Sequence, residues 1–85
     1  MQEFTFTVKD PSGIHARPAG ILVKEASKYK SDITVKHNDK VADAKRIFSV
    51  MGIGAKCGDI LTITINGEDE IDAKANIENL LMEYL

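Results

Sequence analysis

The residues of this chain that are best suited to chemistry lie together in one segment, Gly13-Ile14-His15-Ala16-Arg17-Pro18-Ala19. Proline is tolerated in the first turn of a helix, where its missing N–H would have no intrahelical partner, so Pro18 predicts a helix that begins near residue 16. His15 then lies at the start of this helix. The backbone N–H groups of Ala16 and Arg17 are free to bind an anion at the positive end of the helix dipole. A phosphoryl group would suit such a site.

His15 has the chemistry of a nucleophile in this position. The positive end of the helix favours the neutral imidazole, which offers a ring nitrogen for attack on phosphorus. The backbone donors and the Arg17 guanidinium could then hold the phosphoryl oxygens by charge-assisted hydrogen bonds without strengthening the N–P bond. The same pattern is equally compatible with an exposed helix cap and a solvated arginine, so these residues alone leave the function open.

The other reactive side chains give weaker signals. His37 lies in a polar turn without a second ligand at metal spacing, which predicts a solvated turn residue. Cys57 is the single cysteine, so it has no partner for an internal disulfide. The glycines in Gly52-Ile53-Gly54 lack the third glycine of a dinucleotide-binding loop and indicate the end of a helix.

Seven elements are predicted to position the candidate site. Apolar and polar residues alternate over residues 4–8, 33–36 and 61–65, which is typical of strands with one buried face, and a turn at 37–39 leads into a further short strand around Val41. Apolar residues spaced three and four apart predict helices in three places: from about 16 to 27 or 28, between 45 and 53, and along a stripe from Ala73 to Tyr84 that follows acidic residues at 68–70. The order is strand, helix, strand, strand, helix, strand, helix.

This order predicts an α+β fold. Amphipathic helices beside half-polar strands indicate an open-faced β-sandwich, in which three helices cover one face of a four-stranded antiparallel sheet and the threonine-rich face stays solvated. The 85 residues are enough for one such domain, spanning 1–85.

Composition and charge exclude several classes of protein. With 44% hydrophobic and 28% charged residues, the chain is expected to be globular rather than disordered or membrane-spanning. Its first residues lack the basic and apolar runs of a secretory signal, so we expect a cytoplasmic protein. The net charge of −2 argues against a nucleic-acid partner, and so do strands that present threonine rather than base-stacking aromatic residues.

The charge is divided unevenly along the chain. Residues 1–56 hold ten Lys or Arg and six Asp or Glu, whereas residues 57–85 hold one and seven. Such asymmetry can guide the encounter with an acidic protein surface. An ordinary solvated surface with an acidic last helix explains it equally well.

The segment from Gly13 to Ala19 closely resembles the active-site segment of HPr, the family of histidine-containing phosphocarriers of the bacterial phosphoenolpyruvate-dependent sugar phosphotransferase system. The resemblance covers the whole chain, including its length, the predicted element order, the segment Val41 to Gly54 and the run Asn66-Gly67-Glu68-Asp69-Glu70 before the last helix. It implies an HPr-like fold and a stoichiometric carrier rather than an enzyme. His15 would accept a phosphoryl group from phospho-enzyme I and pass it to the IIA domain of a sugar permease.

The resemblance also implies roles for single residues. In the family the phosphoryl group is attached at Nδ1 of the histidine. Arg17 matches the arginine that contacts this group, and Ala16 supplies a backbone N–H to it. No metal and no cofactor are implied.

The chain between residues 45 and 53 carries more apolar side chains than one face of a two-turn helix can bury. Ile47, Phe48 and Met51 are spaced three and four apart and could form an exposed patch, although core packing is the alternative for each. Through the resemblance, the face that meets enzyme I and IIA is expected to contain Ile47, Phe48 and Met51 together with Ala16, Arg17 and Gly20.

Four basic residues are expected to surround this face, namely Arg17, Lys24, Lys45 and Arg46. Such a rim would suit acidic partners. We expect a monomer that has enzyme I and IIA domains as partners and reaches membrane permeases only through IIA.

The sequence departs from the family in two places. Members in low-GC Gram-positive bacteria carry a regulatory serine after the lysine of the second helix, where this chain has Arg46; Ser49 lies on another part of the helix and is not taken as its replacement. Gly20 lies inside a helix, at a cost of about 1 kcal/mol against alanine; it could admit a partner closely or be neutral. Arg46 leaves open a paralogue that serves a nitrogen-related or other regulatory phosphorelay. A further alternative is a regulatory binding module that uses the apolar patch without being phosphorylated.

Overall fold

The computed structural model describes residues 1–85 and contains all seven predicted elements in the predicted order. Their bounds are β1 (Gln2–Thr7), α1 (Ala16–Ala26), β2 (Asp32–His37), β3 (Lys40–Asp43), α2 (Ile47–Gly52), β4 (Ile60–Asn66) and α3 (Glu70–Tyr84). None of the three helices has the length and apolar composition that crossing a membrane requires.

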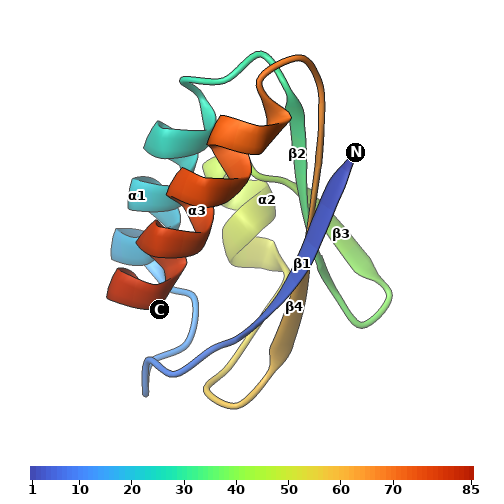
Figure 1. Ribbon diagram of the computed structural model, residues 1–85. Helices are drawn as coiled ribbons and strands as arrows, with labels where there is room; N and C mark the ends of the chain where they lie inside the picture. The colour runs from blue at the N-terminus through green and yellow to red at the C-terminus, as the bar shows by residue number, and fades with distance from the viewer.

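The four strands form one antiparallel sheet in the order β1-β4-β2-β3. In its central register Phe4 lies opposite Ile63, Ile63 opposite Val35, and Val35 opposite Ala42. Figure 1 shows all three helices on one side of this sheet, with α1 and α3 side by side. The prediction of an α+β, open-faced sandwich is confirmed.

The other face of the sheet has no helix over it. Successive strand residues point to opposite faces, so the residues between the buried ones form this open face. Thr5 lies opposite Thr62, and Thr64 lies opposite Thr34, which gives a band of threonines across three strands. The predicted threonine-rich open face is therefore present.

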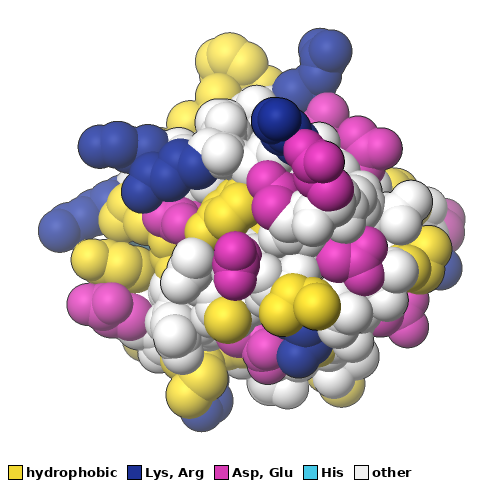
Figure 2. Space-filling view, turned by 45° about the horizontal axis from the view of Figure 1, so that its top comes forward, with side chains coloured by type: hydrophobic (Ala, Val, Ile, Leu, Met, Phe, Trp, Pro, Cys, Tyr) yellow, Lys and Arg dark blue, Asp and Glu magenta, His cyan; other side chains and the backbone are white.

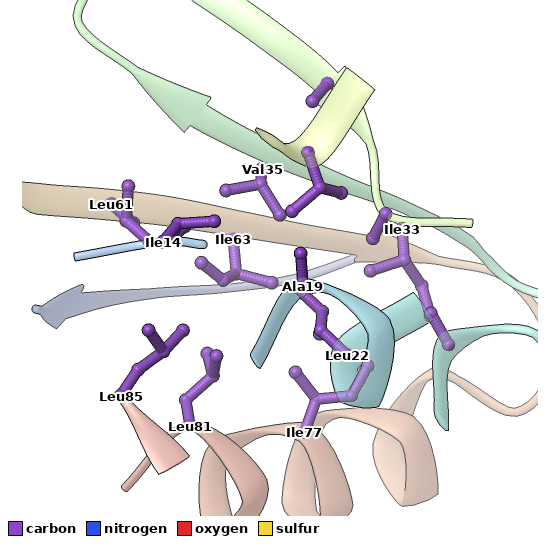
Figure 3. Close-up of a cluster of buried hydrophobic side chains, with 14 of the residues drawn as sticks. Ile14, Ala19, Leu22, Ile33, Val35, Leu61, Ile63, Ile77, Leu81 and Leu85 are labelled. Atoms are coloured by element: carbon purple, nitrogen blue, oxygen red, sulfur yellow. The ribbon is translucent and has the colours of Figure 1, made fainter. Parts of the chain in front are cut away.

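The core lies between the sheet and the helices (Figure 3). Ala19 and Leu22 of α1 and Ile77 and Leu81 of α3 are almost completely buried against strand side chains such as Ile63. Fully burying a leucine or isoleucine stabilises the fold by about 1.5–3 kcal/mol. This packing fixes α1 and α3 against the sheet and so fixes the position at which α1 begins.

Candidate functional site

His15 is the residue directly before α1, as the sequence predicts. Its backbone is extended, with φ −125° and ψ −173°, and its carbonyl accepts the first helical hydrogen bond from the Ala19 N–H at 3.0 Å. The imidazole is 45% exposed and is therefore accessible from solvent. Its Nδ1 atom makes no hydrogen bond within the chain, so this nitrogen is available to a partner.

The turn before His15 is held in place by backbone contacts. The Gly13 N–H donates to the Asp10 carbonyl at 2.9 Å, and the Ile14 N–H donates to the Ala55 carbonyl at 3.1 Å. Gly13 has φ +65°, in the left-handed region that favours glycine, and a Cβ atom there would overlap the Ala55 carbonyl oxygen. The sequence places glycine where no other residue fits.

The first turn of α1 has the character of an anion site. The N–H groups of Ala16 and Arg17 belong to the first turn and have no carbonyl of this helix to bind. Pro18, which is buried, has no N–H to satisfy. This first turn contains no acidic residue, and its one basic residue, Arg17, has an exposed side chain. The structure thus brings His15, Ala16 and Arg17 together.

A pocket of about 250 Å³ opens beside the imidazole, lined by Asp10, His15, Arg17, Pro18, Ile21, Glu83 and Tyr84. Two of these residues come from the end of α3, because the Leu85 carbonyl accepts the N–H groups of Lys9 at 2.5 Å and Asp10 at 2.7 Å. Asp10, Glu83 and Tyr84 are site residues that the sequence did not predict. No local signal identifies them, since only the tertiary fold brings the end of α3 to this turn.

Asp10 contributes the carboxylate that forms an ion-pair contact with the ring of His15. Its Oδ2 atom lies 3.8 Å from His15 Nε2, and its Oδ1 atom accepts the Ser12 N–H at 2.8 Å. The carboxylate therefore faces the nitrogen that is opposite the free Nδ1.

The predicted docking patch, Ile47, Phe48 and Met51, lies on α2 next to α1. Phe48 is 84% exposed, whereas Ile47 and Met51 are half-buried and pack against the core. Gly20 of α1 faces Ile47: a Cβ atom built on Gly20 would lie 3.7 Å from Ile47 Cδ1. The patch thus continues onto the first half of α1, which carries Ala16 and Arg17.

Of the four residues expected to form the basic rim, three are exposed and one is half-buried. Arg17, Lys24 and Arg46 are exposed, and Arg46 Nε lies 3.7 Å from an Asp43 carboxylate oxygen. Lys45 is half-buried, and its ammonium donates to the Tyr29 carbonyl at 2.8 Å. Figure 2 shows one group of basic side chains at the upper left, with further basic side chains at the top and bottom of the view and acidic side chains mostly over its centre and right.

The prediction that His37 is a solvated turn residue is wrong. Only 13% of its side chain is exposed; Nδ1 lies 3.0 Å from the Ile53 carbonyl and Nε2 lies 3.0 Å from Asp59 Oδ2. Asp59 also accepts the Lys56 N–H at 2.9 Å. His37 therefore joins the end of β2 to the loop between α2 and β4. Its neighbours in the sequence are polar, so the local pattern predicted a solvated turn and gave no sign of this contact.

Comparison with known proteins places the chain in a family. The family model described as "PTS HPr component phosphorylation site" matches residues 2–83. The phosphocarrier protein HPr of Lysinibacillus sphaericus is 45% identical over 83 residues, which are 98% of this chain and 94% of that protein.

Solved structures agree with this match. The histidine-containing phosphocarrier protein of a Mycoplasma is 38% identical with a TM-score of 0.94, covering 96% of this chain and 93% of that one. HPr-C-His from Thermoanaerobacter tengcongensis is 34% identical with a TM-score of 0.93, covering 99% and 94%. The chain belongs to the HPr family of phosphocarrier proteins of the phosphotransferase system.

Proposed function

We propose that this protein carries a phosphoryl group on His15 from phospho-enzyme I to the IIA domain of a sugar permease. The observation that supports this most directly is an accessible imidazole at the start of α1, beside the free N–H groups of Ala16 and Arg17. Membership of the HPr family supplies the donor and the acceptor.

The transfer is a displacement at phosphorus. The Nδ1 lone pair of His15 attacks the phosphorus of the donor's phosphohistidine; the new N–P bond forms while the donor's N–P bond breaks, and its electron pair returns to the donor ring. The Ala16 and Arg17 N–H groups and the Arg17 guanidinium hold the phosphoryl oxygens. Attack by the acceptor's histidine reverses these events and regenerates His15, so the protein acts as a stoichiometric carrier rather than as an enzyme.

The docking patch on α2 is the proposed contact for both partners. The exposed Phe48 supplies most of its accessible apolar surface, and Ile47, Met51, Ala16, Arg17 and Gly20 adjoin it. Arg17, Lys24 and Arg46 would attract acidic partner surfaces. The Lys45 ammonium instead donates a hydrogen bond to the Tyr29 carbonyl. We expect the domain formed by residues 1–85 to act as a monomer in the cytoplasm.

Arg46 favours a second candidate function, that of a paralogue in a nitrogen-related or other regulatory phosphorelay. A serine kinase cannot modify arginine, and its charge is opposite to that of phosphoserine. We therefore expect no control through phosphorylation at this position. A paralogue that serves a nitrogen-related or other regulatory phosphorelay would not need that control. The exposed Phe48 keeps a further alternative open, a binding module that needs no phosphorylation.

The test is incubation with enzyme I and phosphoenolpyruvate, followed by mass spectrometry. We expect a single acid-labile, alkali-stable phosphoryl adduct that is absent from His15→Ala and retained in His37→Gln, the matched change at the other histidine. An adduct that survives in His15→Ala, or no adduct with several sources of enzyme I, contradicts the carrier function. Sugar-specific and nitrogen-related IIA domains offered in parallel then distinguish the two relays.

A further inference from the structure

We propose that Asp10 is a positioning residue for His15: its carboxylate holds the imidazole with the proton on Nε2, so that Nδ1 presents its lone pair to the phosphoryl group. This inference rests on the proposed carrier function. It assigns a role to a residue that lies outside the segment from Gly13 to Ala19.

The carboxylate of Asp10 is fixed in direction. Oδ1 accepts the Ser12 N–H at 2.8 Å, which closes a turn between a side chain and the backbone two residues later. The backbone of Asp10 is also held, because its N–H donates to the Leu85 carbonyl at 2.7 Å and its carbonyl accepts the Gly13 N–H at 2.9 Å. With Oδ1 occupied, Oδ2 remains directed toward His15 Nε2 at 3.8 Å.

A neutral imidazole carries one proton, and the hydrogen-bond partner of one nitrogen decides which nitrogen bears it. A carboxylate accepts but does not donate, so Oδ2 favours the tautomer with hydrogen on Nε2. The lone pair then belongs to Nδ1, the nitrogen without a partner in the chain. The separation of 3.8 Å is a charge contact rather than a hydrogen bond, and such contacts often tighten only when the reacting group arrives.

Asp10 also suits the charge that develops during transfer. As Nδ1 forms its bond to phosphorus, the ring keeps its Nε2 proton and becomes positively charged; when the phosphoryl group leaves, the electron pair returns to Nδ1 and the ring is neutral again. No proton is gained or lost in the cycle. A carboxylate on the Nε2 side stabilises the charged ring and lies away from the phosphoryl oxygens, which Arg17 holds.

Asp10→Asn tests the proposal. The asparagine oxygen can still accept the Ser12 N–H, so the turn is kept, but the side-chain NH₂ now faces Nε2 and favours hydrogen on Nδ1. We expect ¹⁵N NMR to show His15 shifting toward the Nδ1–H tautomer. Single-turnover transfer from phospho-enzyme I should slow by about tenfold or more, with affinity for enzyme I unchanged.

Asp43→Asn is the matched control. Asp43 closes the same kind of turn, with Oδ1 accepting the Lys45 N–H at 2.9 Å, but no histidine is its partner. Its substitution should leave the His15 tautomer unchanged. Asp10→Ser is a second variant, which removes the charge without adding an NH₂ group, and should give an intermediate rate.

The tautomer of His15 in the unmodified protein is measured independently of these variants. Hydrogen on Nε2 is the expected result, whereas hydrogen on Nδ1 overturns the proposal even if Asp10→Asn fails to fold. Full-rate transfer by a folded Asp10→Asn also overturns it. A protein that never accepts a phosphoryl group refutes the carrier function instead, while the tautomer measurement still decides the role of Asp10.

Discussion

Gly13 lies so close to Ala55 that a Cβ atom at position 13 would overlap the Ala55 carbonyl oxygen. The same carbonyl accepts the Ile14 N–H at 3.1 Å. The residue before His15 is therefore anchored to the loop between α2 and β4. This contact joins the start of α1 to a residue 41 positions further along the chain.

Gly13→Ala should destabilise the fold and displace His15. Alanine at φ +65° is strained by about 1–3 kcal/mol, and the collision with Ala55 adds to that strain. Gly54→Ala is the matched control, because Gly54 has φ +68° and no atom within 4 Å of its built Cβ. Urea unfolding should show a clearly larger loss for Gly13→Ala. Equal losses would mean that contact with Ala55 contributes nothing.

Gly20→Ala should stabilise the protein by about 1 kcal/mol, because glycine inside a helix is less favourable than alanine by that amount. The added methyl group would lie 3.7 Å from Ile47 Cδ1, which is ordinary van der Waals contact. The midpoint of urea unfolding measures the gain, and a lower midpoint would show that α1 and α2 pack too tightly for it. A loss of enzyme I affinity in the stabilised variant would show that Gly20 admits a partner closely.

Phe48→Ala should weaken partner binding while leaving the fold intact. Phe48 is 84% exposed, so its removal should change the free energy of unfolding by less than about 0.5 kcal/mol. An aromatic anchor at the centre of an interface contributes about 2 kcal/mol or more, so the Kd for enzyme I should rise tenfold or more. Met82→Ala is the control, since Met82 is 72% exposed on α3 and should not affect this Kd. If Phe48→Ala and Met82→Ala change the Kd for enzyme I equally, Phe48 has no specific role in docking.

The sequence predicted the elements well because local patterns determine them. Alternation in residues 61–65 predicted β4, and Pro18 located the start of α1. The strand order β1-β4-β2-β3 was not predicted, since alternation identifies a buried face but not a neighbour.

Contacts between distant residues account for what was missed at the site. The Asp10 N–H donates to the Leu85 carbonyl at the end of α3, and the ammonium of Lys45, which was predicted only as part of the basic rim, donates to the Tyr29 carbonyl. Their partners lie 75 and 16 residues away, beyond the reach of local periodicity.

Asp69 should make stability depend on pH in the acid range. Its carboxylate accepts the Ser31 hydroxyl and the N–H groups of Lys30 at 2.8 Å and Ser31 at 3.0 Å. These hydrogen bonds, the one from the Ser31 hydroxyl above all, hold the pKa of Asp69 below its usual value. Because the folded-state pKa is the lower one, the stabilisation is fully present above the unfolded-state pKa of about 3.9 and is lost as the pH falls through the folded-state pKa.

Asp69→Asn should remove this contribution, which the free energy of unfolding between pH 2 and pH 6 would reveal as a shallower slope. Ser31→Ala removes only the hydroxyl donor and should reduce the slope in part. Some slope should remain in both variants, because the pKa values of Glu25 and Glu70 are also lowered, by hydrogen bonds from Lys28 and from the N-terminal amine respectively. An unchanged slope in Asp69→Asn would contradict the prediction.

His37→Ala should cost about 1–3 kcal/mol of stability, because it leaves the Ile53 carbonyl and the Asp59 carboxylate without their shared partner. Asp39→Ala, a change at an exposed position of the same turn, is the control and should shift the free energy of unfolding by no more than about 0.5 kcal/mol. Phosphoryl acceptance on His15 should persist in both variants. The double variant His37→Ala/Asp59→Asn measures the coupling between the two side chains. If its loss of unfolding free energy equals the sum of the losses in the two single variants, His37 and Asp59 are not coupled and their contact does not stabilise the loop.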